Sequence, residues 1–147
     1  MEALPHALQP AIEHDLDRNG LEVLDRSECL RLLATATLGR VGISAAALPV
    51  ILPVNFRLIG DNIVFRTTSG TKLDAATRGS VVAFEVDAMD PFEHTGWSVM
   101  VTGVARQVTE AAELDAVRPE RVARWAPLGD DRVVSVSTDM ITGRRIL

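Results

Sequence analysis

The segment at residues 65–72, FRTTSGTK, carries groups that bind a phosphate ester. A phosphate needs hydrogen-bond donors that converge on it and a cation nearby. Arg66, the hydroxyls of residues 67–69 and the flexible Gly70 amide are candidate donors, and Lys72 is the candidate cation. These residues predict a phosphate site where a strand turns into a helix. A polar cap with a solvated lysine is the alternative that the residues alone leave open.

Lys72 is the single lysine among the 15 basic residues of the chain. The preference for arginine, together with frequent alanine, is typical of a GC-rich coding bias and explains why lysine is rare. It does not explain why one lysine stands here, which favours a functional role. The segment is not a P-loop, because the upstream glycine of that motif is missing.

Four other residues are candidates for contact with a ligand. Trp97 and Ser98 begin a predicted strand, where a large ring stands beside a small hydroxyl. A tryptophan in such a place is more often part of a core or an interface, and the same holds for Trp125. Asn55 is polar within a strand suited to burial, so it must face solvent or form a hydrogen bond. A structural role is its simpler interpretation.

Other catalytic chemistry has little support in this chain. The motifs GxSxG, GxGxxG, HExxH and CxxC are all missing. The single cysteine, Cys29, fits the apolar face of a helix, and the 3 histidines are scattered. We therefore predict no metal site and no side chain that acts as a catalytic nucleophile.

Length and charge narrow the class of protein further. A chain of 147 residues is enough for one domain. It has 20 acidic and 15 basic residues, and no basic stripe follows the chain, so we expect no nucleic-acid partner. We also expect no membrane association and a cytoplasmic location, because no apolar run is long enough to span a bilayer and no leader peptide is recognisable.

The elements that must position these residues are mostly strands. Residues 1–20 have little periodicity and are predicted to form an N-terminal arm, and residues 21–147 the domain. A helix capped by Asp25 or Ser27 is expected to end near residues 37–39. Short helices are also expected at residues 73–78 and within residues 109–125. The expected strands cover residues 39–44, 49–58, 62–67, 80–87, 96–107, 131–138 and 140–146.

The connections between these strands are mostly short, which favours an antiparallel sheet over a parallel one. Pro53 suits an edge or a bulge, and residues 59–62 predict a tight hairpin turn. Gly103 marks a bulge or bend. About six strands then close into a small barrel with helices packed outside it.

The order of the motifs carries more information than any one of them. LGRVG, PVILPVNF, IVFRTTSGTKL, VVAFEVD, GWSVMVTGVA and ITGRRI follow one another along the chain. This order resembles the pyridoxamine 5′-phosphate oxidase-like family of FMN-binding split barrels, and within it the short nitroimidazole-resistance-like branch. The resemblance covers residues 25–146. It implies a mainly β fold with peripheral helices, in which a six-stranded antiparallel split barrel forms a homodimer with the flavin between the subunits.

The resemblance also assigns roles to residues. Residues 52–55 would run beside the isoalloxazine and offer main-chain contacts. The strand end at residues 65–68 would meet the ribityl chain and the phosphate, and Lys72 would bind the phosphate. Trp97 and Ser98 would reach the flavin from the dimer partner, and Trp125 would cover the ring. The implied cofactor-binding residues are Pro53, Val54, Asn55, Phe65, Arg66, Thr67, Thr68, Lys72, Trp97, Ser98 and Trp125.

The activity that the resemblance implies is that of an FMN-dependent oxidoreductase acting on an unknown small molecule. The flavin carries the hydride or electron chemistry, while the protein orients it. Two departures argue against true pyridoxamine phosphate oxidase activity: Thr71 replaces the arginine that precedes the phosphate-binding lysine, and no histidine follows His94. The alternatives are a deazaflavin-dependent reductase on the same fold and a non-catalytic module that binds or stores flavin.

Overall fold

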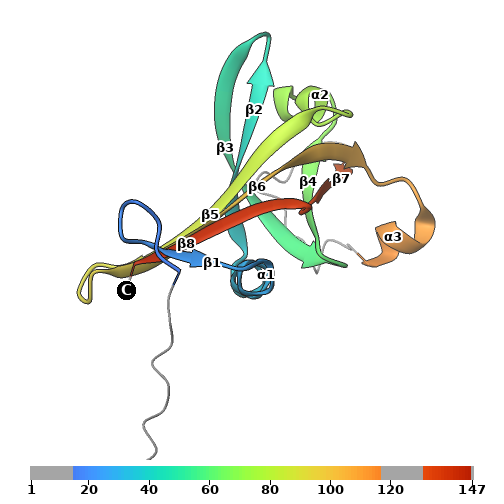
Figure 1. Ribbon diagram of the computed structural model, residues 1–147. Helices are drawn as coiled ribbons and strands as arrows, with labels where there is room; N and C mark the ends of the chain where they lie inside the picture. The colour runs from blue at the N-terminus through green and yellow to red at the C-terminus, as the bar shows by residue number, and fades with distance from the viewer. Residues whose placement is uncertain (1–14, 117–130, 147) are drawn as a thin grey trace, which may run out of the picture.

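The computed structural model describes residues 15–116 and 131–146 (Figure 1). The strands are β1 (Glu22–Leu24), β2 (Leu38–Ala45), β3 (Leu48–Ile59), β4 (Asn62–Thr68), β5 (Val81–Asp90), β6 (Thr95–Gln107), β7 (Asp131–Ser137) and β8 (Met140–Ile146). The helices are α1 (Arg26–Thr35), α2 (Lys72–Ala76) and α3 (Ala111–Ala116). No helix in this part of the chain is long and apolar enough to cross a bilayer.

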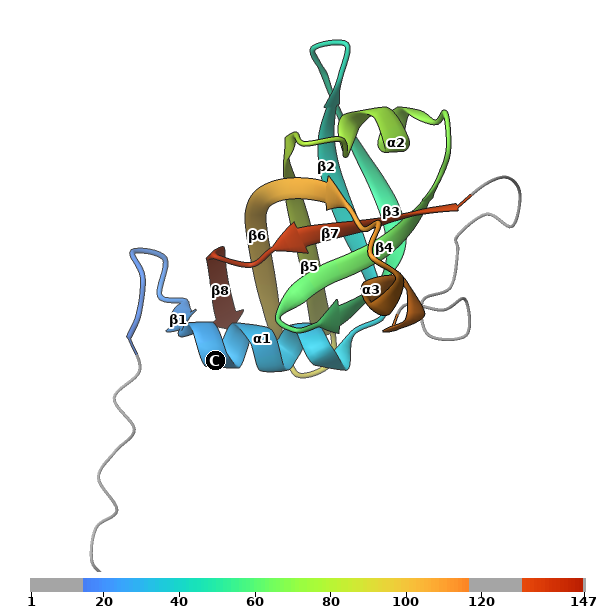
Figure 2. The same ribbon diagram turned by 90° about the vertical axis from the view of Figure 1, so that its right-hand side faces the viewer.

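The strands form one antiparallel sheet in the order β1-β8-β6-β5-β2-β3-β4-β7. A further pairing between β6 and β7 closes six of them into a barrel, which confirms the predicted six-stranded antiparallel barrel (Figure 2). Strands β8 and β1 extend the sheet beyond the barrel. The sequence does not predict β1, because a strand of three residues is too short to show a periodicity.

β6 belongs to both parts of the sheet and changes partner along its length. Its first half pairs with β8 as far as Thr102, and it pairs with β7 from Ala105 onward. Gly103 lies between these two stretches, where an added Cβ would meet the Ser137 carbonyl oxygen at 2.5 Å. A glycine is needed here because β6 and β7 approach each other closely at the bend.

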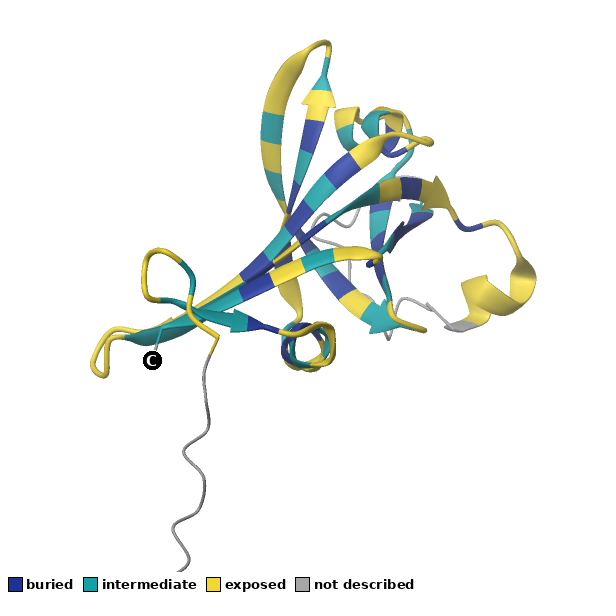
Figure 3. Ribbon diagram, viewed as in Figure 1, coloured by how far each residue is buried: buried dark blue, intermediate teal, exposed yellow. Residues whose placement is uncertain are grey.

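Alternating apolar residues of the strands fill the barrel, as the bands of buried and exposed residues in Figure 3 show. Phe84 of β5 lies at the centre of this core. Its ring centroid is 4.9 Å from that of Phe56 and 6.5 Å from that of Phe65. Gly39 leaves room for this ring, because a Cβ at residue 39 would lie 2.3 Å from the Phe84 Cζ. Four residues from four different strands thus fit together in one tightly packed centre.

The helices lie at opposite ends of the barrel, α1 at one and α2 at the other (Figures 1 and 2). The N-cap of α1 is Asp25 rather than Ser27, since its carboxylate accepts from the Glu28 amide at 2.8 Å. α1 ends at Thr35, before the predicted residues 37–39, because β2 already begins at Leu38. The buried residues of α1, Cys29 among them, belong to the core.

Two local predictions about the β2–β3–β4 region can be compared with the structure. Residues 48–55 of β3 pair with β2 only, so Pro53 does lie at an edge. The turn between β3 and β4 is tight, as expected, but its two positive φ angles belong to Gly60 and Asp61. Asn62, the last residue of the predicted turn, is already the first residue of β4.

Residues 15–20, the described end of the predicted arm, fold back onto β8. Asp17 accepts from the amides of Asn19 and Leu21 and forms an ion pair with Arg144 at 3.0 Å. Leu16 forms an isolated bridge with Glu22. The end of the predicted arm therefore contacts the sheet extension, and residues 1–14 lie outside the described part of the chain.

Candidate functional site

A groove of about 520 Å³ opens where β3 and β4 separate. The two strands pair as far as Phe56 and Phe65, and beyond that point β4 continues along β7 only. The groove therefore has the unpaired edge of β3 on one side and the end of β4 with the start of α2 on the other. Its lining residues are Val50, Leu52, Pro53, Val54, Arg66, Thr67, Thr68, Thr71, Lys72 and Leu73.

The structure brings six predicted cofactor-binding residues together in this groove, namely Pro53, Val54, Arg66, Thr67, Thr68 and Lys72. They come from β3, from β4 and from the first position of α2. Sequence analysis does not single out Val50 or Leu73, because an apolar side chain on a groove wall has the same local pattern as one in a core.

The two cations of the groove differ in their surroundings. The Arg66 guanidinium is 9% exposed and forms an ion pair with Asp131 of β7 at 3.0 Å. Lys72 is exposed, and within residues 15–116 and 131–146 the structure gives it no hydrogen bond or ion pair. Lys72 is therefore the cation that a bound anion can reach without first displacing a carboxylate.

Thr67 supports a polar ligand in the groove. Its hydroxyl is buried and has no hydrogen-bond partner among the described residues, and the same is true of the Arg66 Nε atom. A buried polar atom without a partner costs roughly 1–3 kcal/mol. A ligand with oxygen atoms beside the Thr67 hydroxyl would remove that cost, and a ribityl phosphate has such atoms.

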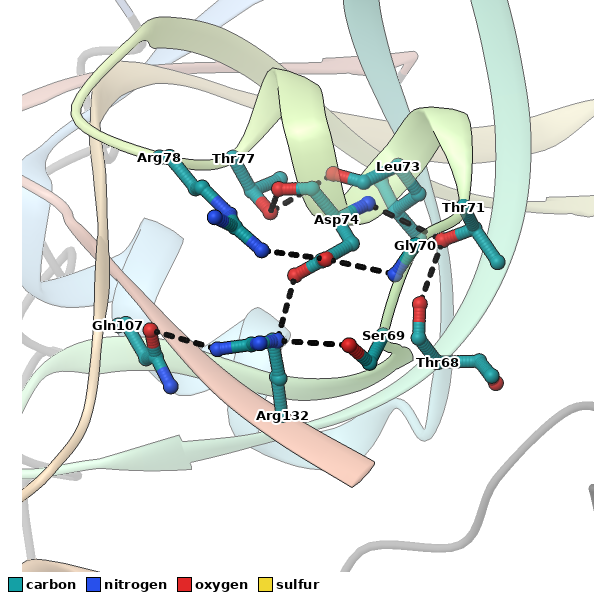
Figure 4. Close-up of polar contacts among 10 residues, drawn as sticks. All are labelled: Thr68, Ser69, Gly70, Thr71, Leu73, Asp74, Thr77, Arg78, Gln107 and Arg132. Carbon is teal, nitrogen blue, oxygen red and sulfur yellow. Dashed lines mark hydrogen bonds and ion pairs between the residues drawn. The ribbon is translucent and has the colours of Figure 1, made fainter. Parts of the chain in front are cut away.

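The turn between β4 and α2 is held by its own side chains (Figure 4). The Gly70 amide donates to the Asp74 carboxylate at 2.9 Å. The Thr71 hydroxyl donates to the Thr68 carbonyl at 2.8 Å and accepts from the Asp74 amide at 3.1 Å. The expectation that the Gly70 amide is a phosphate donor is therefore wrong, because this amide is engaged within the turn. Local pattern does not show that Asp74 is buried.

Two other predicted residues near the groove do not line it. The Phe65 side chain lies in the barrel core against Phe84, and the whole residue is buried. Asn55 is half-buried and stands opposite Leu38 on β2. The alternation of a strand explains Phe65, because its neighbours Arg66 and Val64 must face the other way.

Trp97 and Ser98 lie beside a second groove, of about 410 Å³, which also involves Asp87, Arg144 and Arg145. Within one chain, this groove does not include any residue of the first one. Trp97 packs against the core, while Ser98 is paired with Asp87 on the opposite face of the sheet. Trp125 lies outside the described residues. The predicted flavin-binding roles of these three residues stay predictions.

The side of the sheet that faces away from the core forms what we call the outer face, made by β3, β2, β5, β6 and β8. Residues directly opposite one another across a sheet share a face, and one such row joins Pro53, Arg40, Glu85 and Met100. The exposed apolar side chains of this face include Leu38, Ile51, Val81, Met100, Val104 and Met140. Since Pro53 belongs to both features, the first groove opens beside the outer face.

Glu85 is the unusual acid of the outer face. Burial, together with the hydrogen bond and the negative charge of Asp87, raises the pKa of its carboxyl from 4.5 to about 7. Arg40, 3.4 Å from Glu85, opposes this increase only partly. Because the folded protein holds the proton more tightly than the unfolded chain, the free energy of unfolding should fall as the pH rises from about 4.5 to about 7.

We therefore expect Glu85→Gln to remove this pH dependence. At pH 8 the variant should be more stable than the parent by about 1 kcal/mol, a value reduced for solvent screening of a partly exposed group. Urea unfolding between pH 4.5 and pH 8 measures this. Glu113→Gln, in an exposed ion pair with Arg106, is the control and should keep the parental slope. If the free energy of unfolding of Glu85→Gln falls with pH as steeply as that of the parent, Glu85 is not the group responsible.

The family model of pyridoxamine 5′-phosphate oxidase matches residues 25–145. This match spans the whole barrel, including both sides of the groove. The chain belongs to the pyridoxamine 5′-phosphate oxidase family. Membership agrees with the resemblance inferred from the motifs and with the closed six-stranded barrel.

One curated relative is similar to this chain in sequence, and two solved structures share its fold. The uncharacterized protein Rv0080 of Mycobacterium tuberculosis is 40% identical, with 84% of each chain covered. The FAD-binding protein of Mycobacterium smegmatis is 36% identical, with a TM-score of 0.74 over 84% of this chain and 97% of that one. A FAD-binding protein of Mesorhizobium loti has 17% identity and a TM-score of 0.71 over 86% and 99%, and shows the fold alone.

Proposed function

We propose that this protein binds FMN in the groove between β3 and β4 and acts as a flavin-dependent oxidoreductase on a small molecule. The observation that carries the proposal concerns two residues that line the same groove. Among the described residues, the Lys72 cation has no hydrogen bond or ion pair, and the buried Thr67 hydroxyl has no hydrogen-bond partner. The cation would bind the phosphate, and the hydroxyl would accept or donate a hydrogen bond at the ribityl chain. When bound, the flavin supplies the hydride or electron transfer.

The edge of β3 supports the position of the flat ring. The Phe56 amide donates toward β2, to the Thr37 carbonyl at 2.9 Å. Because donors alternate along a strand, the amides of Ile51 and Asn55 point away from β2, whereas Pro53 has no amide hydrogen and offers only its carbonyl. The free amides and carbonyls of this edge can form hydrogen bonds with the donors and acceptors of an isoalloxazine. The proline, which has no amide hydrogen, disfavours pairing with a further β-strand.

We further propose that the protein forms a homodimer through the outer face. The apolar side chains of this face are exposed in a single chain, and a second copy would remove them from water. The groove borders the same face at Pro53, so the second copy would also cover the open side of the groove. Ser98 lies on the outer face too, which supports its predicted contact with the partner's flavin.

The test is an absorption spectrum of the purified protein followed by equilibrium titrations with FMN, riboflavin, FAD and the deazaflavin coenzyme. We expect FMN to bind more tightly than riboflavin, because only FMN has the phosphate. Tighter binding of FAD, as the name of the FAD-binding protein of Mycobacterium smegmatis suggests, or of the deazaflavin coenzyme would replace FMN as the cofactor. Binding of none of the four would contradict the proposal.

A second experiment separates an oxidoreductase from a module that only stores flavin. The protein loaded with FMN is mixed with NADH or NADPH without oxygen, and the loss of flavin absorbance is followed. Rapid bleaching supports the oxidoreductase, whereas bleaching no faster than that of free FMN with either donor favours storage. The cytoplasmic location and the absence of nucleic-acid and membrane partners stay predictions.

A further inference from the structure

We propose that Asp74 is a positioning residue, which holds the turn at residues 69–71 so that Thr68 and Lys72 can bind the phosphate end of the ligand. The inference rests on the proposed function of the groove. Asp74 itself does not line the groove. Its effect on the ligand would therefore pass through the turn.

The carboxylate of Asp74 is placed for this role by burial and by its partners. Its side chain is only 3% exposed. Oδ2 accepts from the Gly70 amide at 2.9 Å and from Arg78 at 2.9 Å, and Oδ1 lies 3.3 Å from the Arg132 Nε. Both oxygens are thus engaged, and a buried carboxylate with this set of partners is costly to disturb.

Arg132 connects the turn to the rest of the barrel. It comes from β7, and besides Asp74 it reaches Ser69 Oγ at 3.3 Å and Gln107 Oε1 at 3.2 Å, as Figure 4 shows. The turn is therefore fastened to β7 and to the end of β6. Without Asp74, Arg132 would lose its carboxylate partner and the Gly70 amide would lose its acceptor.

The sequence around the turn makes its shape depend on these contacts. Gly70 is exposed and has a φ of +83°, and no described atom outside its chain neighbours lies within 4 Å of the position that a Cβ would take. The hydrogen bond to the Asp74 carboxylate restrains its amide. Since Thr68 precedes the turn and Lys72 follows it, a movement of the turn would change the spacing between them.

The electrostatics of the cluster favour a charged Asp74. Burial on its own would raise the pKa of the Asp74 carboxyl, but the hydrogen bond from Gly70 and the charges of Arg78 and Arg132 outweigh it, so the pKa lies below its ordinary value. The carboxylate is then ionised at neutral pH, and it compensates two arginines close to the turn. Lys72 is left as the cation that faces the ligand.

The decisive quantity is the ratio of the dissociation constants for riboflavin and FMN, because the two ligands differ only in the phosphate. In Asp74→Ala we expect this ratio to fall about tenfold, while riboflavin binding stays within about twofold of the parent. A general loss of structure would weaken both ligands and leave the ratio unchanged. Arg132→Ala, which keeps Asp74 and its bond to Gly70, should lower the ratio less and serves if Asp74→Ala does not fold.

Arg26→Ala is the matched control for lost stability. The Arg26 guanidinium of α1 donates a hydrogen bond to the Thr138 hydroxyl at 3.1 Å, away from the groove. This variant should melt at a lower temperature but keep the parental ratio. The inference is overturned if folded Asp74→Ala has the same ratio of riboflavin to FMN dissociation constants as the parent. If only Arg132→Ala folds, the same result in that variant overturns it. A parent protein that does not prefer FMN to riboflavin overturns the proposed phosphate site itself, and the inference with it.

Discussion

Lys72→Ala is expected to weaken FMN binding by about tenfold to a hundredfold. The change removes one charge-assisted contact with the phosphate, worth roughly 1.5–3 kcal/mol. The Lys72 side chain is exposed and has no hydrogen bond or ion pair with the described residues, so the fold should not change. Fluorescence titration of the parent and the variant with FMN measures the effect. Riboflavin should bind both proteins alike, because it has no phosphate.

Arg31→Ala is the matched control for Lys72→Ala. It also removes one positive charge, from an exposed position on α1 outside the groove, and should leave FMN affinity unchanged. The parent's FMN affinity should fall as salt is added, and the Lys72→Ala variant should depend on salt less. Equal FMN affinity in the parent and in Lys72→Ala would remove Lys72 from the site.

Met100→Arg should dissociate the proposed dimer. Met100 is 49% exposed, and β6, to which it belongs, has a strand on each side in the outer face. A central interface residue contributes about 2 kcal/mol or more, so the dimer dissociation constant should rise by about 30-fold or more. Within one chain the new arginine stands opposite Glu85, which allows the single chain to keep its fold. Sedimentation velocity over a range of concentrations gives the constant.

FMN binding gives a second measurement on Met100→Arg. If the second copy completes the groove, FMN binding should weaken together with dimerisation, although Met100 does not line the groove. Leu114→Arg is the matched control, since it places the same charge on a 38% exposed leucine of α3, off the outer face. An unchanged sedimentation profile for Met100→Arg would contradict the outer face as the interface.

Local sequence patterns predict most of this fold. The strand predicted at residues 62–67 is present as β4, with Ile63 and Phe65 in the core and Arg66 outside it. Pro53 is at an edge, and the helix cap is at one of the two expected residues, Asp25. These features depend on a few neighbouring residues, and for that reason they can be inferred from the chain.

Local sequence patterns are less informative about which residues lie close together in the folded chain. Trp97 and Ser98 are adjacent, but adjacent side chains of a strand point to opposite faces, so Trp97 packs against the core while Ser98 lies on the outer face. The Gly70 amide is a plausible phosphate donor until the buried carboxylate of Asp74 is placed beside it. Nothing near Asp74 in the sequence indicates that Arg132 of β7 is its partner.

By itself, then, the sequence determined the strands of the barrel, the family and the segment that carries Lys72. The tertiary structure decided which polar groups of that segment are left for a ligand. Arg66 and Lys72 are equivalent cations in the sequence, yet Arg66 is paired with Asp131, brought close by the β4–β7 ladder. Lys72 remains unengaged among the described residues. The physical reason is that a charge is neutralised by whatever lies near it in space, and proximity in space is set by strand pairing rather than by local sequence.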